Sequence, residues 1–175
     1  SGNKITSMRK LFIALTLTVC FIACKDNKPK DCPSGKPLPI FTKEMSVVKN
    51  HSFNAQGQKS QEEVGLANGT RLEIFQQGCD TLSQSFRFSF SHLITRDSFV
   101  TTIDSAISQF RYLSAANEKL KPFVIWSDAL TQLRTHIRQG EYLDLDRGIK
   151  LRIDQLDQGS GTTIVLDVMQ ISSTH

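Results

Sequence analysis

Ser85-Phe86-Arg87-Phe88-Ser89-Phe90-Ser91 alternates strictly between polar residues and phenylalanine. Successive side chains of a β-strand point to opposite faces of its sheet. The alternation therefore predicts a strand that buries its three phenylalanines on one face and presents polar residues on the other. This is the clearest strand signal in the chain.

A β-hairpin is predicted over residues 64–75, just upstream of this strand. Two apolar-rich runs flank Asn68-Gly69, a dipeptide that supplies the positive φ angles of a two-residue type I′ turn. Residues 40–58 are less distinct. We expect a strand within 40–48, where apolar residues gather, and a loop at 54–58.

The hydrophobic period then changes from that of a strand to that of a helix. The first predicted helix has an apolar face made of Phe99, Ile103, Ile107 and Phe110. The second has an apolar face made of Trp126, Leu130, Leu133 and Ile137. Asp97 is the expected N-cap of the first helix, and a break at residues 115–122 separates the two. Ser127 or Asp128 is expected to cap the second helix, and Gly140 to end it.

A second hairpin follows the helices. Residues 149–153 and 163–171 are predicted to be strands joined by a turn at residues 157–161. The order is therefore hairpin, strand, two helices, hairpin. This order predicts an α+β fold, in which the helices pack on one face of an antiparallel sheet. Residues 40–175 are expected to form this single globular domain.

The N-terminal residues have the parts of a secretion signal. Arg9 and Lys10 precede an uncharged apolar stretch at residues 11–23. As a helix this stretch would span only about 20 Å, too short to cross a bilayer. Residues 8–23 are therefore expected to be a signal peptide. Residues 1–7 are expected to be an upstream extension or a cloning remnant.

Phe21-Ile22-Ala23-Cys24 resembles the lipobox of bacterial lipoproteins, although Phe21 stands where leucine is usual. The resemblance implies that Cys24 is acylated after the signal is removed, which anchors the protein in the outer membrane of the cell envelope. Lys25-Asp26 resembles the surface-export signal of Bacteroidota lipoproteins, so the protein would face the periplasm or the cell surface. Residues 24–39 would then be a tether rich in proline and lysine. The alternative is an ordinary signal peptide with an incidental cysteine.

The four cysteines reduce to one candidate pair on this interpretation. Cys20 leaves with the signal and Cys24 carries lipid, so Cys32 and Cys79 remain. In an oxidising envelope such a pair is expected to form a disulfide, which would contribute about 3–4 kcal/mol by closing a long loop. An intermolecular bridge or two free thiols remain open alternatives. The chain contains no Cys-x-x-Cys motif, so neither a redox motif nor a zinc site is indicated.

The charge of the chain argues against nucleic acid as a partner. Removal of residues 1–24 takes away Lys4, Arg9 and Lys10 and no acid, so the formal charge falls from +4 to +1. The remaining sequence has no basic stripe to neutralise a phosphate backbone.

No recognised catalytic or metal-binding motif is present in the sequence. The histidines His51, His92, His136 and His175 lack a second ligand at metal-binding spacing. We assign His51 to a loop and His136 to the second helix. Asp144-Leu145-Asp146-Arg147-Gly148 is better explained as a turn than as a calcium loop, because ligands of that loop are missing. The sequence therefore predicts no cofactor, metal or small-molecule ligand.

Two classes of function remain. The first is a non-catalytic, membrane-anchored protein that binds another protein, such as an immunity or inhibitor protein, or an accessory subunit of an envelope assembly. Trp126 and Tyr142 are its candidate contact surface, because these residue types are enriched at interface centres. The second class is an envelope hydrolase with an unfamiliar site, which would use His51, His92 or His136 together with nearby acids.

Overall fold

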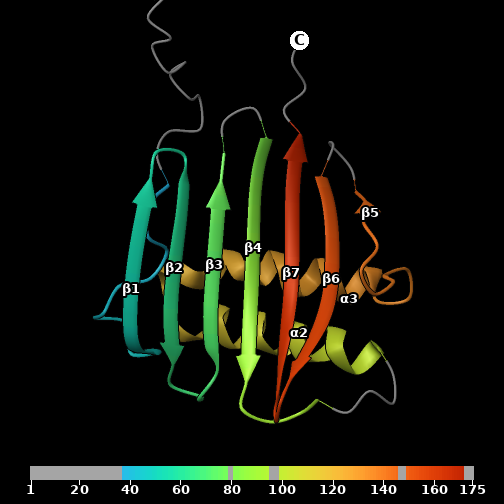
Figure 1. Cartoon of the computed structure of the whole chain (residues 1–175), viewed down its shortest axis with the longest axis horizontal. Helices are drawn as coiled ribbons and strands as arrows, with labels where there is room; N and C mark the ends of the chain where they lie inside the picture. The colour runs from blue at the N-terminus through green and yellow to red at the C-terminus, as the bar shows by residue number, and fades with distance from the viewer. Residues whose placement is uncertain (1–36, 79–80, 95–98, 146–148, 172–175) are drawn as a thin grey trace, which may run out of the picture. The chain divides into compact units, whose positions relative to one another are not determined.

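The computed structural model describes residues 37–78, 81–94, 99–145 and 149–171, all within one compact unit. A seven-stranded antiparallel sheet runs through it in the order β1-β2-β3-β4-β7-β6-β5 (Figure 1). The strands are β1 (Val48–Gln56), β2 (Lys59–Leu66), β3 (Arg71–Gln77), β4 (Thr81–Phe90), β5 (Leu143–Asp144), β6 (Ile149–Gln158) and β7 (Gly161–Ile171). Between β4 and β5 lie the helices α2 (Phe99–Ala116), η2 (Glu118–Phe123), which is a 3₁₀-helix, and α3 (Val124–Leu133).

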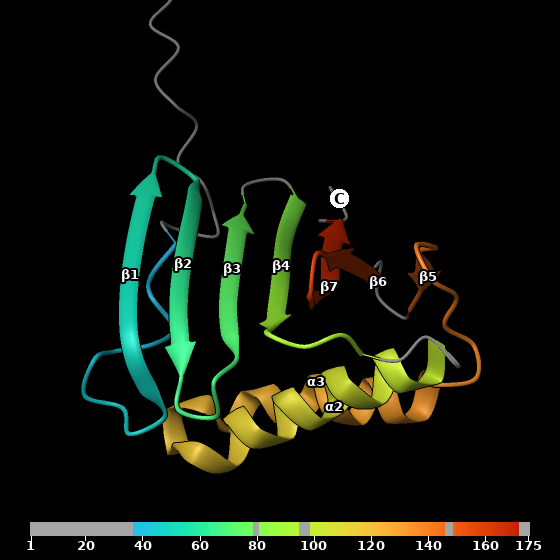
Figure 2. The same cartoon turned by 60° about the horizontal axis from the view of Figure 1, so that its bottom comes forward.

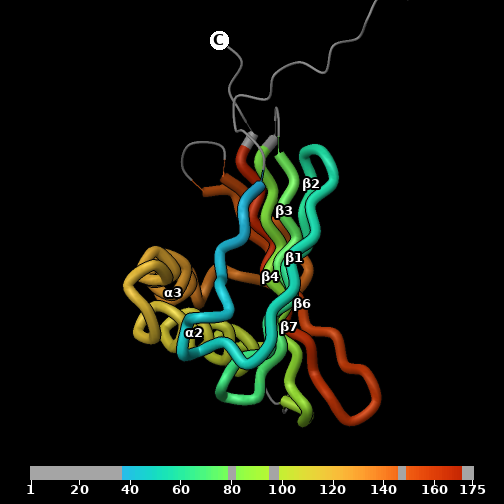
Figure 3. The backbone as a smooth tube through the Cα atoms, turned by 90° about the vertical axis from the view of Figure 1, so that its left-hand side faces the viewer, coloured from blue at the N-terminus to red at the C-terminus, as the bar shows by residue number. Residues whose placement is uncertain are grey.

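Helices α2 and α3 pack on each other and lie on the same face of the sheet (Figures 2 and 3). The opposite face carries Phe75, Ser85, Arg87 and Asp167, and we call it the open face. No element within the described residues covers it (Figure 3). The predicted α+β fold, an antiparallel sheet with its helices on one face, is confirmed.

Phenylalanines join the sheet to the helix layer. Phe86 and Phe88 of β4 are buried, and their rings meet Phe110 of α2 edge to face, with centroid distances of 5.5 and 5.2 Å. Phe123 of η2 lies 5.7 Å from Phe86 in the same geometry. Phe90, near the end of β4, is only partly buried. The sequence alternation of β4 thus identifies the centre of the core, where such ring pairs add about 0.5–1.5 kcal/mol each beyond the burial of area.

The structure contradicts the prediction for residues 40–58. Residues 40–47 form no strand but pass along the helix side of the sheet (Figure 3), where they bury Phe41, Met45 and Val47. Strand β1 begins only at Val48 and continues through the predicted loop to Gln56. It is an edge strand with mostly exposed polar side chains, so the alternation that marks a half-buried strand is absent.

The hairpin of β2 and β3 is confirmed, but its turn differs from the predicted two-residue type. The Gly69 N–H donates to the Leu66 carbonyl at 3.0 Å, which places Ala67 and Asn68 at the centre of the turn. The Leu66 N–H donates to the Thr70 carbonyl at 2.8 Å and closes a three-residue loop. Gly69 ends this loop with φ +88°. Asn68 instead stabilises the loop through its side chain, whose Oδ1 accepts the Thr70 N–H at 3.0 Å.

The predicted ends of the second helix are wrong. Helix α3 continues directly from η2, whose carbonyls accept the first N–H group of α3, so no side-chain cap is needed. Ser127 is buried inside the helix, where its hydroxyl donates to a backbone carbonyl one turn earlier at 2.8 Å. Neither Ser127 nor Asp128 is a cap. The helix also ends at Leu133, well before Gly140, because the chain turns there to bury Ile137 in the core.

Candidate functional site

The two aromatic residues predicted to mark one contact surface lie on opposite sides of the sheet. Trp126 belongs to α3 and lines a cleft on the helix side. Tyr142 directly precedes β5 and is 43% exposed. Leu143 pairs with Leu151 and packs against the core, so the side chain of its neighbour Tyr142 points to the open face. The structure therefore does not bring Trp126 and Tyr142 together.

Tyr142 forms a stack with two charged residues of the open face. The guanidinium carbon of Arg152 on β6 lies 5.0 Å from the centre of the Tyr142 ring. Arg152 Nε donates a hydrogen bond to Asp167 Oδ2 on β7 at 3.1 Å. This bond raises the pKa of the Arg152 guanidinium above its ordinary value, because the carboxylate stabilises the charged form. The cation is thereby fixed against the aromatic ring.

A second arginine–aromatic pair lies on the same face. The guanidinium carbon of Arg87 on β4 is 4.6 Å from the ring centre of Phe75 on β3. The register aligns Phe75, Ser85, Asp167 and Arg152 in one row across four strands. The face therefore presents aromatic rings, cations and a carboxylate together; the aromatic rings and arginines are residue types that are enriched at protein interfaces.

The small serines of β4 leave a hollow in the middle of this row. The hollow has a volume of about 320 Å³, and we call it the open-face hollow; its walls include Phe75, Ser83, Tyr142, Asp167 and Met169. Ser85 Oγ is buried there and makes no hydrogen bond to any described residue. Asp167, its cross-strand neighbour, is paired with Arg152 and does not accept a hydrogen bond from Ser85, so the serine is not activated as a nucleophile by a described residue. The hollow is large enough to receive a side chain.

His51 is the histidine that meets a carboxylate. It lies in β1 rather than in the predicted loop, with Nε2 at 2.8 Å from Glu62 Oε1. Glu62 is fully buried, and it also accepts the N–H groups of Ile40, at 2.9 Å, and Phe41, at 2.8 Å. Both carboxylate oxygens are thus occupied by the protein itself. This arrangement fixes the segment before β1 to the sheet and gives a substrate no access to the carboxylate.

The other described histidines form no such pair. His92 is exposed and contacts the Phe90 ring at 5.8 Å, and His136 lies in the turn after α3, with Nδ1 at 3.3 Å from the Thr135 hydroxyl. Neither has a carboxylate partner within the described part of the chain. In that same part no three residues among histidine, cysteine, aspartate and glutamate are placed to hold a metal ion.

Several predicted residues lie outside the described ranges. They are the lipidation site Cys24, the disulfide candidates Cys32 and Cys79, the helix cap Asp97, His175, and Asp146 to Gly148 of the possible calcium loop. The signal peptide and most of the tether lie outside these ranges as well. No helix within the described residues is long and apolar enough to cross a membrane.

Sequence reasoning missed three glutamines that face the cleft beside Trp126: Gln76, Gln84 and Gln170. Each occupies an inward position of its strand, next in the alternation to buried apolar residues such as Ile74, Phe86 and Val168. The sequence signal for these glutamines is a polar residue at a position where the strand alternation predicts an apolar one. Such a position indicates a part of the inner sheet face that solvent can reach.

Comparison of the chain with models of protein families, with curated proteins and with solved structures finds no significant match.

Proposed function

We propose that this chain is a membrane-anchored lipoprotein of the cell envelope whose folded domain is a non-catalytic protein-binding module, as in an immunity or inhibitor protein. The anchor is supported by the resemblance of residues 21–24 to a lipobox. The binding role is supported above all by the open-face hollow, which lies between Phe75 and the Tyr142–Arg152–Asp167 stack. Aromatic and arginine side chains around a hollow are frequent hot spots of protein interfaces.

The charged side chains of the open face indicate which kind of partner it would bind. Arg71 pairs with Glu63 and Glu73, and Arg152 with Asp167, so charges of both signs are distributed over the face. A partner of strong single-sign charge is therefore not favoured. The expected partner inserts an apolar side chain into the hollow and surrounds it with polar groups. A stoichiometric resident partner would make the chain an accessory subunit of an envelope assembly.

The binding role is tested with a variant that fills the hollow. Ser83→Arg places a long side chain in it, whereas Gln132→Arg adds the same charge to an exposed position of α3 on the helix side and is the matched control. A partner is captured from envelope extracts with the wild-type chain, purified and titrated by calorimetry. We expect Ser83→Arg to weaken its binding by at least about tenfold and Gln132→Arg to leave it unchanged. Equal binding by both variants would refute the role of the hollow.

The anchor is tested separately. Cys24→Ser removes the sulfur that would carry the lipid, so the protein should move from the membrane fraction to the soluble fraction of cells. Unchanged membrane fractionation would show that Cys24 is not the anchor.

A further inference from the structure

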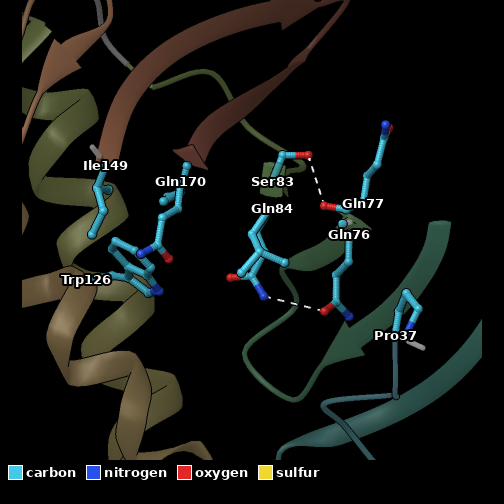
Figure 4. A pocket seen from close by; sticks show the side chains of 11 residues that line it. Pro37, Gln76, Gln77, Ser83, Gln84, Trp126, Ile149 and Gln170 are labelled. Carbon is cyan, nitrogen blue, oxygen red and sulfur yellow. Dashed lines mark hydrogen bonds between the residues drawn. The ribbon is translucent and has the colours of Figure 1, made fainter. Parts of the chain in front are cut away.

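A cleft of about 250 Å³ lies on the helix side of the sheet, beside α3 and the ends of β3, β4 and β7 (Figure 4). Figure 4 shows Trp126 and Gln170 on one side of the cleft, Gln76 and Pro37 on the other, and Gln84 between them. The cleft and the open-face hollow lie on opposite faces of the sheet and share lining residues of β3, β4 and β7, among them Gln76, Ser83 and Gln84.

The three glutamines of the cleft form a continuous polar surface. Gln76 and Gln84 are cross-strand partners, and Gln84 also pairs with Val168, two residues before Gln170. All three side chains therefore lie on the same face of the sheet. Gln84 Nε2 donates to Gln76 Oε1 at 3.4 Å, and Gln76 Nε2 donates to the Leu38 carbonyl at 3.3 Å. These bonds orient two amides toward the cleft.

Three other polar groups of the cleft have no partner among the described residues. The Gln170 amide, Gln84 Oε1 and Trp126 Nε1 make no hydrogen bond to any described residue. The Trp126 indole N–H is not among the fully buried polar atoms, so solvent reaches it and it is available to donate a hydrogen bond to a ligand in the cleft. Lysine, arginine, aspartate, glutamate and histidine are all absent from the described residues that line the cleft.

We propose that this cleft binds a neutral saccharide. Sugar hydroxyls donate and accept hydrogen bonds at once, as carboxamide side chains do, and the C–H face of a sugar ring packs on an indole. A phosphate or carboxylate ligand would find no cation among the described residues that line the cleft. A peptide strand would need a free sheet edge, but β3, β4 and β7 each have a neighbour on both sides.

The size of the cleft is consistent with one sugar ring. Pockets for drug-sized ligands are typically about 300–1,000 Å³, somewhat larger than this one. Gln170 and Leu82, which are cross-strand partners at the cleft, are exposed, so a longer glycan can continue into solvent past them.

Trp126 is the only tryptophan in the chain, so its fluorescence reports on this cleft alone. The full-length protein is titrated with glucose, galactose, mannose, N-acetylglucosamine, cellobiose and maltose. We expect a saturable change in emission with at least one of them. Calorimetry with that sugar should show about tenfold weaker binding for Gln84→Leu and for Gln170→Ala, because each loses one amide partner.

The controls separate loss of the site from loss of the fold. Gln170 is exposed, so its replacement is expected to leave the fold intact even if Gln84→Leu does not. Ser52→Ala on the exposed edge strand β1 should bind the sugar as the wild type does. The proposal is overturned if no saccharide of the panel binds, or if both glutamine variants bind with wild-type affinity. Tighter binding of a neutral tetraproline peptide than of any sugar would also overturn it.

Discussion

Glu62 is the residue on which the start of the domain depends. Its carboxylate has no exposed area, yet it accepts two backbone N–H groups and lies beside His51 Nε2. The hydrogen bonds from Ile40 and Phe41 hold residues 40–47 over the inner face of the sheet. Phe41 in turn stacks on Phe123 with a centroid distance of 6.1 Å. One buried acid thus couples the N-terminal segment to the helix layer.

Glu62→Leu should therefore be strongly destabilising. Leucine is similar in size but leaves two buried N–H groups and His51 without an acceptor, a loss that costs about 3–5 kcal/mol for a buried paired charge. Urea unfolding of the full chain measures the loss. Glu63→Gln, an exposed neighbour on the open face, is the control and should stay within about 0.5 kcal/mol of wild type. A Glu62→Leu variant as stable as this control would contradict the structural role.

The role of Glu62 could not be predicted from the sequence. A glutamate between Gln61 and Glu63 reads as part of an exposed polar run, and its donors Ile40 and Phe41 are far away in the chain. Trp126 is a candidate contact residue from the sequence, but its neighbours in the cleft come from β3, β4 and β7. The sequence shows which residue types are present. The residues that each of them contacts depend on the order of the strands in the sheet, which the sequence does not show directly.

At the scale of elements, the turn between β6 and β7 depends on the strand beside it. Gln158 pairs with Gly161, so the loop is only Gly159-Ser160 rather than all of residues 157–161. A Cβ atom added at Gly161 would lie 2.6 Å from the backbone carbonyl oxygen of Phe90 on β4. That oxygen belongs to the sheet backbone and cannot move aside easily. Glycine is required here by close approach of two strands.

Gly161→Ala should consequently lower the free energy of unfolding by about 1–3 kcal/mol, the usual cost of overpacking. Ser160→Ala, one residue away in the exposed tip of the turn, should change it by less than about 0.5 kcal/mol. Thermal unfolding monitored by circular dichroism compares the two. If both variants melt with the wild type, the Phe90 carbonyl does not constrain position 161.

Helices and strands with a regular hydrophobic pattern could be predicted from the sequence. Elements whose ends depend on contacts with distant parts of the chain could not. The phenylalanine alternation of β4 and the helical spacing of Ile103, Ile107 and Phe110 both identify residues that are buried in the core. Strand β1 escaped prediction because an edge strand with polar side chains shows no alternation. The end of α3 was not predicted, because it is determined by the burial of Ile137 and not by Gly140.

At the scale of the whole molecule, we expect the stability of the folded state to depend on the predicted Cys32–Cys79 disulfide. Both residues lie outside the described ranges, so the expectation rests on the sequence. Closing a loop of about 48 residues should stabilise the folded state by about 3–4 kcal/mol. Cys32→Ser should therefore lower the urea midpoint of protein purified under oxidising conditions, and reductant should lower that of the wild type equally. A wild-type midpoint insensitive to reductant would favour free thiols.

The sheet and the helix layer share one hydrophobic core, to which β2, β3, β4, β6 and β7 contribute together with α2, η2 and α3. Because neither layer has a separate core, the two should unfold as one cooperative unit. The chain allows a direct test. Trp126 on α3 reports the helix layer, while far-ultraviolet circular dichroism reports the sheet as well.

We expect urea transitions followed by these two signals to coincide in midpoint and slope. The variant Leu130→Ala, which removes a fully buried side chain of α3, should shift both curves together by about 2–5 kcal/mol. If Trp126 fluorescence changed at lower urea than circular dichroism, the helix layer would be a separate folding unit. The cleft beside Trp126 would then open without loss of the open face, and the two binding surfaces would have independent stabilities.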